Sequence, residues 1–223
     1  MNKNKIFVAC DSTNISKVKE IIKYTKTSKI KIGYKFGLEF LNSKNGRNFL
    51  SSIKKKIIFA DLKLHDIPNT CVSTIKAIKD LKVNYLTIHI SSGLEALRAV
   101  KKISGKTKII GVTILTSLDN KALKEIGFKK NVEQLVLQQA KLANKAKLDA
   151  LVCSAREVPI IRKVFKKEII TPGISFNKQK NDQKRMANPH EALYKYKSDW
   201  LVIGRSLTKG NIKKNLQNLI SQI

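Results

Sequence analysis

Short apolar runs alternate along the whole chain with amphipathic segments. The runs cover residues 6–10, 30–33, 57–63, 83–90, 108–113, 149–153, 168–171 and 200–203. Apolar runs of this length, bounded by polar residues, are typical of buried strands. In the segments between them apolar residues recur three or four positions apart, as at Ile15, Val18 and Ile22, and this spacing predicts helices.

The order of these elements predicts the fold class. We expect helices at residues 14–26, 36–52 (in parts), 68–81, 93–102, 132–146, 156–165, 188–196 and 207–223. Alternating strands and helices indicate a parallel sheet with right-handed crossovers. Eight such units without a linker predict one domain over residues 1–223, a (β/α)₈ TIM barrel. Residues 175–186 have almost no apolar periodicity, and we expect a mobile loop there.

Composition excludes several classes of protein. The chain has 223 residues and 42% hydrophobic residues, which is enough for a core, and no apolar run is long enough to span a membrane. The apolar run near the N-terminus ends before Asp11 and is too short for a signal peptide, so we expect a cytoplasmic protein. Three cysteines far apart, Cys10, Cys71 and Cys153, have no metal or redox spacing and are interpreted as reduced thiols.

The net charge of +29 raises the question of a nucleic-acid partner. Of the 45 basic residues only six are arginine, and the lysines are spread over nearly every predicted helix. Arginine-rich base readout and aromatic stacking platforms are both missing. We therefore expect no nucleic-acid partner. A basic nucleic-acid-binding module remains the rival from a different class, and it would leave the polar residues at the strand ends without a role.

Polar residues follow the predicted strands where a barrel of this type has its active site, at the carboxyl ends. They are Asp11, Lys31, Asp61, Lys63, Thr116 and Arg205. Asp61 and Lys63 are two positions apart on one strand, so they should share a face. Burying such charges unpaired is costly, which favours a functional site over packing.

The surroundings of these residues leave some alternatives open. Asp11 is either a helix cap or a carboxylate that binds hydroxyls. Lys31, between two isoleucines, should face the barrel mouth and meet the carboxylates of the third strand. His89, alone on an apolar strand, is more often a packed residue than a catalyst. Pro68 suits the first turn of a helix, which places Asp66 in the preceding loop.

A phosphate site is predicted after the last two strands. Gly173 follows the seventh strand, and Gly204 and Arg205 follow the eighth. The loops at these two positions commonly bind phosphate in TIM barrels, and an arginine fork suits phosphate oxygens. The polar loop, with Gln179 and Gln183, could close over the same group as a lid.

With these residues in place, the chain resembles the orotidine 5′-phosphate decarboxylase family, of the compact bacterial type, over essentially its whole length. The most specific match is D-L-K-L-H-D-I-P-N-T at residues 61–70. Weaker motifs occur in the right order at residues 8–11, 30–33, 113–117, 152–155, 171–174, 182–183 and 202–205.

The resemblance implies decarboxylation of orotidine 5′-phosphate to uridine 5′-phosphate in pyrimidine synthesis, with no cofactor and no metal. It implies that Lys63 donates the proton to C6 of the pyrimidine and that Asp61 lies beside the substrate carboxylate. Lys31 and Asp66 would complete a Lys-Asp-Lys-Asp array. The resemblance also implies a homodimer in which the second subunit contributes Asp66, Ile67 and Thr70.

The same resemblance implies the substrate contacts. Asp11 and Lys31 would hold the ribose hydroxyls and Thr116 the base, while the phosphate would meet Gln183, Gly204 and Arg205. The other implied substrate-binding residues are Leu62, Leu64, His65, Pro68, Asn69 and Ser175. Ser175 stands where many bacterial members carry arginine, and the loop after it appears one residue shorter. This leaves open which of Asn177, Gln179 or Gln183 contacts the phosphate.

The nearest rival is a sugar-phosphate lyase on the same barrel. Such lyases share a D-x-K-x-x-D stretch but use Mg²⁺, which is held partly by a glutamate at the end of the second strand. In this sequence we expect Lys31 at that place, a cation where a metal ligand would be needed. The I-P-N-T continuation at residues 67–70 also favours the decarboxylase.

Overall fold

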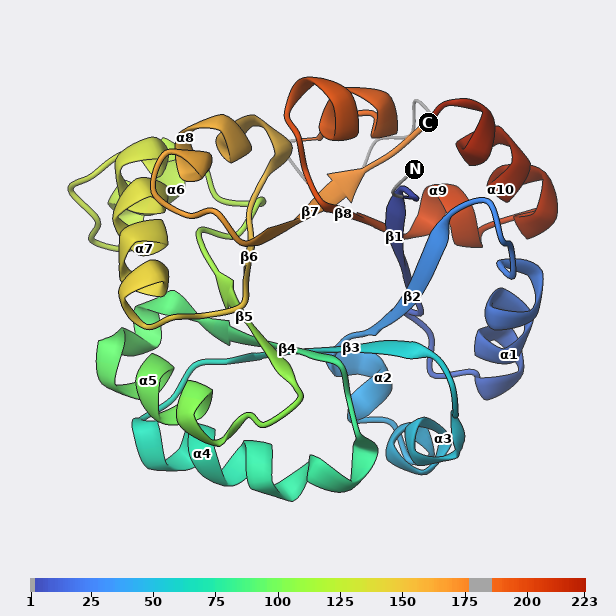
Figure 1. Ribbon diagram of the computed structural model, residues 1–223, viewed down its shortest axis with the longest axis horizontal. Coiled ribbons are helices and arrows are strands. Elements are labelled where there is room, and N and C mark those ends of the chain that lie inside the picture. The colour runs from blue at the N-terminus through green and yellow to red at the C-terminus, as the bar shows by residue number, and fades with distance from the viewer. Residues whose placement is uncertain (1–2, 177–185) are drawn as a thin grey trace.

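The computed structural model of the protein describes residues 3–176 and 186–223. Within them eight parallel strands close into a barrel in sequential order, with helices around the outside (Figure 1). This confirms the predicted (β/α)₈ fold class. The strands are β1 (Lys5–Ala9), β2 (Lys31–Phe36), β3 (Ile57–Leu64), β4 (Tyr85–His89), β5 (Lys108–Val112), β6 (Ala150–Val152), β7 (Glu168–Ile174) and β8 (Trp200–Ile203).

The helices occupy most of the predicted intervals, with three differences. The helices are α1 (Ile15–Tyr24), α2 (Leu38–Leu41), α3 (Gly46–Ser52), α4 (Pro68–Ala77), α5 (Gly93–Ile103), α6 (Asn120–Glu125), α7 (Val132–Lys145), α8 (Val158–Arg162), α9 (Arg205–Thr208) and α10 (Ile212–Ser221). Short turns of helix lie at η1 (Lys79–Leu81), η2 (Ile90–Ser92), η3 (Ala155–Glu157) and η4 (Glu191–Lys195). The prediction missed α6, extended α8 too far and joined α9 and α10, because short helices give little periodicity. None of the described helices has the length and apolar character needed to cross a membrane.

The inside of the barrel is filled by aromatic side chains near the amino ends of the strands. Phe7 stacks on Trp200 with ring centroids 4.1 Å apart, and it meets Phe59 edge-on at 5.0 Å. Gly33 makes room for this packing, because a Cβ atom there would lie 2.6 Å from the Phe7 ring. The larger core lies between the strands and the surrounding helices. The packed floor leaves the carboxyl ends of the strands as the open end of the barrel.

Strand β2 begins later and runs further than predicted, which corrects one site residue. Lys31 is its first residue and pairs with Lys5 of β1 at the amino end of the barrel. There the Lys31 Nζ atom lies 5.9 Å from the Trp200 ring centroid. The expectation that Lys31 faces the barrel mouth is therefore wrong. Lys35 shares its face of β2 and lies about 13 Å further along the strand, at the mouth.

The chain itself explains the error. The pattern Lys-x-Gly occurs twice in succession, as Lys31-Ile32-Gly33 and as Lys35-Phe36-Gly37. Both lysines face the barrel interior, because four positions are two full periods of a strand. Alternation alone therefore gives the correct face for either lysine, and only the register shows which of the two reaches the mouth.

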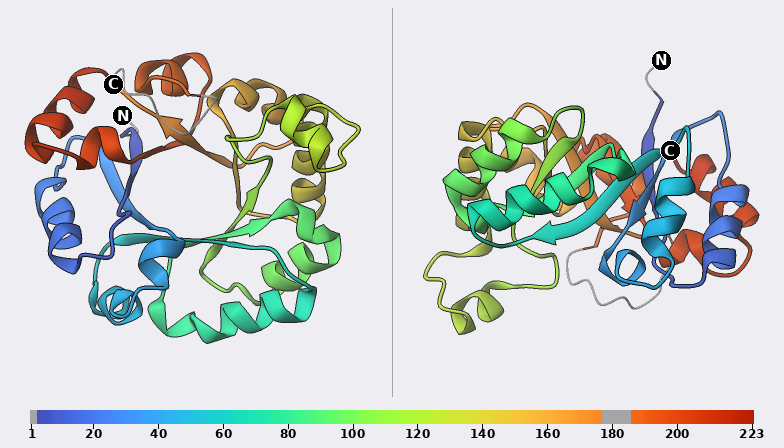
Figure 2. Two further views of the ribbon diagram at one scale, coloured as in Figure 1. Left: turned by 180° about the vertical axis from the view of Figure 1, so that it is seen from behind. Right: turned by 90° about the horizontal axis from the view of Figure 1, so that it is seen from below.

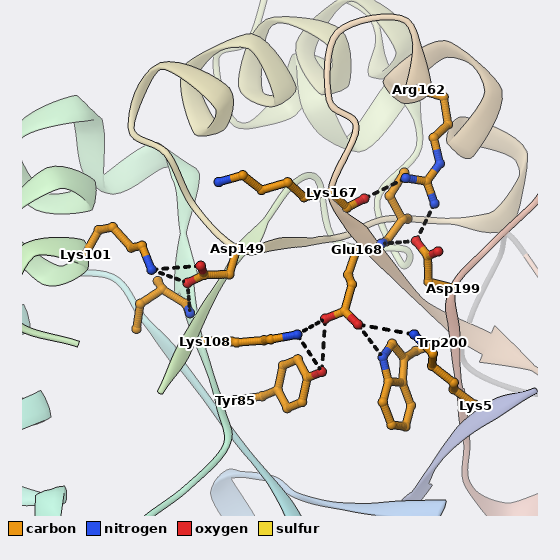
Figure 3. A network of polar contacts seen from close by, with 12 residues as sticks. Lys5, Tyr85, Lys101, Lys108, Asp149, Arg162, Lys167, Glu168, Asp199 and Trp200 are labelled. Carbon is orange, nitrogen blue, oxygen red and sulfur yellow. Dashed lines mark hydrogen bonds and ion pairs between the residues drawn. The ribbon is translucent and has the colours of Figure 1, made fainter. Parts of the chain in front are cut away.

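A network of ion pairs covers the amino end of the barrel (Figure 3). Glu168 of β7 is at its centre: Oε2 accepts from Lys108 Nζ at 2.7 Å and from the Tyr85 hydroxyl at 3.0 Å. Its Oε1 accepts from Trp200 Nε1 at 3.3 Å and lies 3.4 Å from Lys5 Nζ. One carboxylate thereby connects five strands of the barrel, which is consistent with a stabilising role at this end of the fold.

Glu168 should make the fold sensitive to acid. Burial acts to raise the pKa of this carboxyl, but the hydrogen bonds from Lys108 and Tyr85 outweigh it and the pKa is lowered. Its contribution to stability is therefore complete above the pKa of the unfolded chain and is lost as the pH falls through the folded value. We expect Glu168→Gln to lower Tm by about 2–6 °C at pH 7, with the difference from wild type shrinking below about pH 4.

Thermal denaturation followed by circular dichroism between pH 3 and pH 8 measures this effect. The control is Glu125→Gln, which changes an exposed carboxylate at the end of α6. An equal Tm loss at every pH for Glu168→Gln would mean that packing around the side chain matters and its charge does not.

Candidate active site

A pocket of about 540 Å³ opens at the carboxyl ends of the strands. Its walls come from every strand except β4, and from the segments that follow β1, β2, β5, β6 and β8. The charged residues that line it are Asp11, Lys35, Glu39, Asp61, Lys63, Arg205 and Lys209. Lysines, an arginine and carboxylates thus converge on one cavity, as the polar residues at the strand ends predicted.

Four of these side chains form an alternating row of charges across β1, β2 and β3. Asp11 Oδ1 accepts a hydrogen bond from Lys35 Nζ at 3.0 Å, and Lys35 Nζ lies 3.6 Å from Asp61 Oδ2. The same Asp61 oxygen accepts from Lys63 Nζ at 2.8 Å. The prediction that Asp61 and Lys63 share a face is confirmed, and Lys35 stands where Lys31 was expected.

The buried members of this row are charged. Burial acts to raise the pKa of Asp61, but the ammonium groups of Lys35 and Lys63 more than compensate, and the pKa is lowered. Burial acts to lower the pKa of Lys35, but Asp61 and then Asp11 outweigh it, and the pKa is raised. The site therefore holds a fixed carboxylate between two cations at neutral pH.

The backbone at Lys63 departs from regular strand geometry. Its φ angle is +47°, in the left-handed region that residues other than glycine rarely adopt. The register between β3 and β4 is broken between Ala60 and Leu64, and the Lys63 N–H donates to Thr87 Oγ1 at 2.8 Å. Strained backbone of this kind clusters at functional sites, which agrees with the position of Lys63 in the pocket.

The rest of the 61–70 stretch leaves the pocket of its own chain. Leu62 and Leu64 pack against the outer core towards the helices and do not line the pocket, and their contact with substrate stays a prediction. His65, Pro68 and Asn69 do not line the pocket either. Pro68 begins α4 after an extended Ile67, as the sequence predicted.

The three residues that the resemblance assigns to a second subunit are among the exposed residues of this stretch. The side chains of Asp66, Ile67 and Thr70 are exposed, and Ile67 is 65% exposed. Asp66 Oδ1 accepts from the Ile67 N–H at 2.7 Å, and Asp66 does not line the pocket. Within one chain, the described row of charges therefore runs from Asp11 to Lys63 and does not include Asp66.

Two histidines lie beside the row. The rings of His65 and His89 have centroids 5.1 Å apart, and His65 Nε2 lies 3.2 Å from Ser91 Oγ. Burial, and then the charges of His65 and Lys63, lower the pKa of His89 to about 4. His89 is therefore neutral at pH 7.

The part of the pocket formed by the ends of β7 and β8 carries the residues predicted to bind phosphate. Gly173, Gly204 and Arg205 line it, and Thr116 lines the wall after β5. Ser175 lies outside the pocket wall, and its N–H donates to the Ala187 carbonyl at 3.2 Å. Gln183 and its alternatives Asn177 and Gln179 lie outside the described residues, as does the rest of the expected lid over residues 177–185.

Among the charged and hydroxyl-bearing residues that line the pocket, sequence reasoning missed four: Lys35, Glu39, Ser206 and Lys209. The second Lys-x-Gly pattern was a signal for Lys35. Lys209 follows Arg205 by one helical turn, so its place on the same side could have been inferred. Among residues 3–176 and 186–223, no three His, Cys, Asp or Glu side chains come together as a metal-binding group.

Comparison with known proteins assigns the chain to a family. The family model described as "Orotidine 5'-phosphate decarboxylase / HUMPS family" matches residues 4–215. The chain belongs to this family. It is 42% identical to the orotidine 5′-phosphate decarboxylase of Wolbachia sp. subsp. Brugia malayi (strain TRS), covering 97% of each chain. It is 40% identical to that of Ehrlichia chaffeensis, covering 92% of this chain and 90% of the relative.

Solved structures of family members have the same fold. The crystal structure of orotidine 5′-phosphate decarboxylase from Lactobacillus acidophilus superimposes with a TM-score of 0.83 at 26% identity, covering 98% of each chain. The enzyme from Methanocaldococcus jannaschii, complexed with the inhibitor BMP, gives a TM-score of 0.78 at 20% identity and 99% coverage of both chains, which bears on the fold alone.

Proposed function

We propose that this chain is a carboxy-lyase that converts orotidine 5′-phosphate to uridine 5′-phosphate and CO₂ in pyrimidine synthesis, without a cofactor. The observation that carries the proposal is the charged row Asp11–Lys35–Asp61–Lys63 at the mouth of a barrel of this family. A pocket lined by carboxylates, lysines and an arginine suits a substrate that carries a ribose, a reacting carboxylate and a phosphate.

Lys63 is the proposed proton donor. When the bond from C6 to the carboxylate breaks, the electron pair stays on C6 and CO₂ leaves. A fixed ammonium at that point stabilises the developing negative charge. The Lys63 Nζ proton then forms the new C6–H bond, and Lys63 regains a proton from solvent.

Asp61 is the proposed neighbour of the substrate carboxylate. Two like charges about 4 Å apart repel by roughly 4 kcal/mol at an effective dielectric constant of about 20. The repulsion disappears when the substrate carboxylate leaves as neutral CO₂. Lys35 and Lys63 keep Asp61 ionised although it is only 8% exposed, so the charge is present when substrate binds.

The remaining contacts follow from the two sides of the pocket. Asp11 and Lys35 are the proposed contacts to the ribose hydroxyls, because both line the pocket and contact each other. Lys35 has the role that the sequence analysis gave to Lys31. Thr116 is the proposed contact to the base. Gly204 and Arg205, at the start of α9, are the proposed contacts to the phosphate.

A second copy of the chain is the proposed source of Asp66. The carboxylate is exposed and does not reach Lys63 of its own chain. Ile67 beside it is 65% exposed, the most exposed of the large apolar side chains described, and contact with a second copy would remove this apolar surface from water. We infer a homodimer in which Asp66, Ile67 and Thr70 enter the partner's site.

Lys35 favours the proposed decarboxylase over a magnesium-dependent lyase. It occupies the carboxyl end of β2, where such a lyase needs a carboxylate, and its Nζ atom lies 3.6 Å from Asp61 Oδ2. A divalent cation bound to Asp61 would have to sit beside this ammonium, which is electrostatically unfavourable.

The direct test is the loss of orotidine 5′-phosphate absorbance with purified protein, with and without EDTA. We expect equal rates in both conditions. Inactivation by EDTA with rescue by Mg²⁺ would support the lyase instead. That the charge of +29 serves no nucleic-acid partner stays a prediction, and a salt-sensitive RNA or DNA shift at physiological ionic strength would contradict it.

Arg205 gives a more specific prediction. If it binds the phosphate, Arg205→Ala should raise KM for orotidine 5′-phosphate by about 10–100-fold, the usual loss for one charge-assisted hydrogen bond. It should change kcat/KM for the nucleoside orotidine, which has no phosphate, by less than about threefold. Steady-state kinetics on both substrates measure this, and equal damage to both would mean that Arg205 has a structural role.

A further inference from the structure

We propose that Thr87 is a positioning residue for this reaction, because its hydroxyl ties the backbone of Lys63 to the carboxylate of Asp61. The inference rests on the proposed function for its kinetic consequence only. The structural link itself is independent of the substrate.

Thr87 lies in the middle of β4 and is completely buried. Its Oγ1 atom accepts a hydrogen bond from the Lys63 N–H at 2.8 Å and donates one to Asp61 Oδ1 at 3.1 Å. A backbone N–H can only donate and an ionised carboxylate can only accept, so the direction of both bonds is fixed. One hydroxyl group therefore serves both members of the central ion pair.

The hydrogen bond from the Lys63 N–H to Thr87 Oγ1 takes the place of a backbone hydrogen bond that is missing from the β3–β4 ladder. The β3–β4 ladder is interrupted between Ala60 and Leu64, and Lys63 in this interval has a φ angle of +47°. A partly buried N–H in such a bulge needs a partner, and the Thr87 hydroxyl is that partner. The conformation that brings the Lys63 side chain over Asp61 is thus held by a side chain of the neighbouring strand.

The second bond sets the orientation of the carboxylate. Thr87 takes Oδ1 of Asp61, which leaves Oδ2 for Lys63 at 2.8 Å and Lys35 at 3.6 Å. Rotation of the carboxylate would break the bond to Thr87. The hydroxyl therefore fixes Asp61 and Lys63 relative to each other before substrate arrives, and such pre-organisation lowers the barrier of the chemical step.

Removing only the hydroxyl tests this role. Thr87→Val keeps the shape of the side chain but leaves the Lys63 N–H and Asp61 Oδ1 without their partner. A displacement of about 1 Å at a reacting group costs on the order of 10²-fold in rate, so we expect kcat to fall by about that factor. KM should change by less than about threefold, because the phosphate and ribose contacts remain. Thr87→Ser, which restores the hydroxyl, should recover kcat to within about fivefold of wild type.

Thr171→Val is the matched control. Thr171 of β7 is also completely buried, and its Oγ1 atom lies 2.7 Å from Ser198 Oγ. Neither residue lines the pocket, so this variant loses a buried hydrogen bond away from Lys63 and should keep kcat near the wild-type value. Equal losses of kcat in the two valine variants, or a serine variant as slow as Thr87→Val, would overturn the proposal.

Amide hydrogen exchange of Lys63, followed by NMR, tests the link without any substrate. We expect the Lys63 N–H to be protected in wild type and Thr87→Ser, and to exchange at least about tenfold faster in Thr87→Val. Equal exchange in all three would overturn the proposal whatever the kinetics show. Absence of decarboxylase activity in wild type would overturn the proposed function and leave the exchange result to decide on Thr87.

Discussion

Replacing Lys63 with alanine should lower kcat for orotidine 5′-phosphate by about 10⁴-fold or more, because one change removes both the proposed proton donor and a fixed cation. The reason lies in the position of its ammonium group, 2.8 Å from Asp61 Oδ2 and inside the pocket. Without it, the electron pair left on C6 has neither a counter-charge nor a proton source. The fold should persist, because Asp61 keeps its contact with Lys35 and its bond from Thr87.

The structure offers a matched control for this variant. Lys31→Ala also removes a lysine from the interior face of the barrel, but at the amino end, beside Trp200. Because β2 places Lys31 away from the pocket, we expect kcat within about threefold of wild type. Single-turnover decarboxylation by both variants measures the contrast. A Lys63→Ala enzyme that loses binding alone, with kcat preserved, would exclude the role as proton donor.

The contrast between Lys31 and Lys35 shows which structural properties the sequence alone predicts and which it does not. Periodicity predicted the fold class, and alternation predicted that Asp61 and Lys63 share a face, because both follow from local backbone geometry. The end of the barrel that a residue occupies depends on pairing with the neighbouring strand. The pairing of Lys5 with Lys31 is a non-local property, and the repeated Lys-x-Gly pattern concealed it.

Thr87 shows a second limit. A threonine within an apolar strand is ordinary for a β-strand, and no local pattern marks it. Its importance arises because β3 has an irregular register beside it, so that the Lys63 N–H turns towards the hydroxyl. Such irregularities depend on the packing of the whole barrel, and the D-L-K sequence at residues 61–63 does not predict them.

The proposed contribution of a second subunit to the site predicts the second large effect, which a hybrid dimer measures. Asp66→Asn should be severely impaired, although Asp66 does not line the pocket of its own chain. Asparagine keeps an oxygen that can accept from the Ile67 N–H, so the local turn should survive the loss of charge. If Asp66 acts in the partner's site, each active site contains Lys63 of one subunit and Asp66 of the other. The substitutions Lys63→Ala and Asp66→Asn then affect a given site through different subunits.

Different purification tags on the two subunits allow two kinds of hybrid dimer to be isolated. In one the two substitutions are on different subunits, and in the other both are on the same subunit. In a hybrid of Lys63→Ala with Asp66→Asn, one site has both defects and the other has neither. Because a two-fold dimer has two equivalent sites, this hybrid should regain about half of the wild-type activity per dimer, far above either parent. In the reciprocal hybrid, one subunit carries both substitutions and the other is wild type. Each of its sites then has one defect, and we expect it to be nearly inactive. An active reciprocal hybrid together with an inactive first hybrid would mean that Asp66 acts within its own subunit, and the shared-site proposal would be wrong.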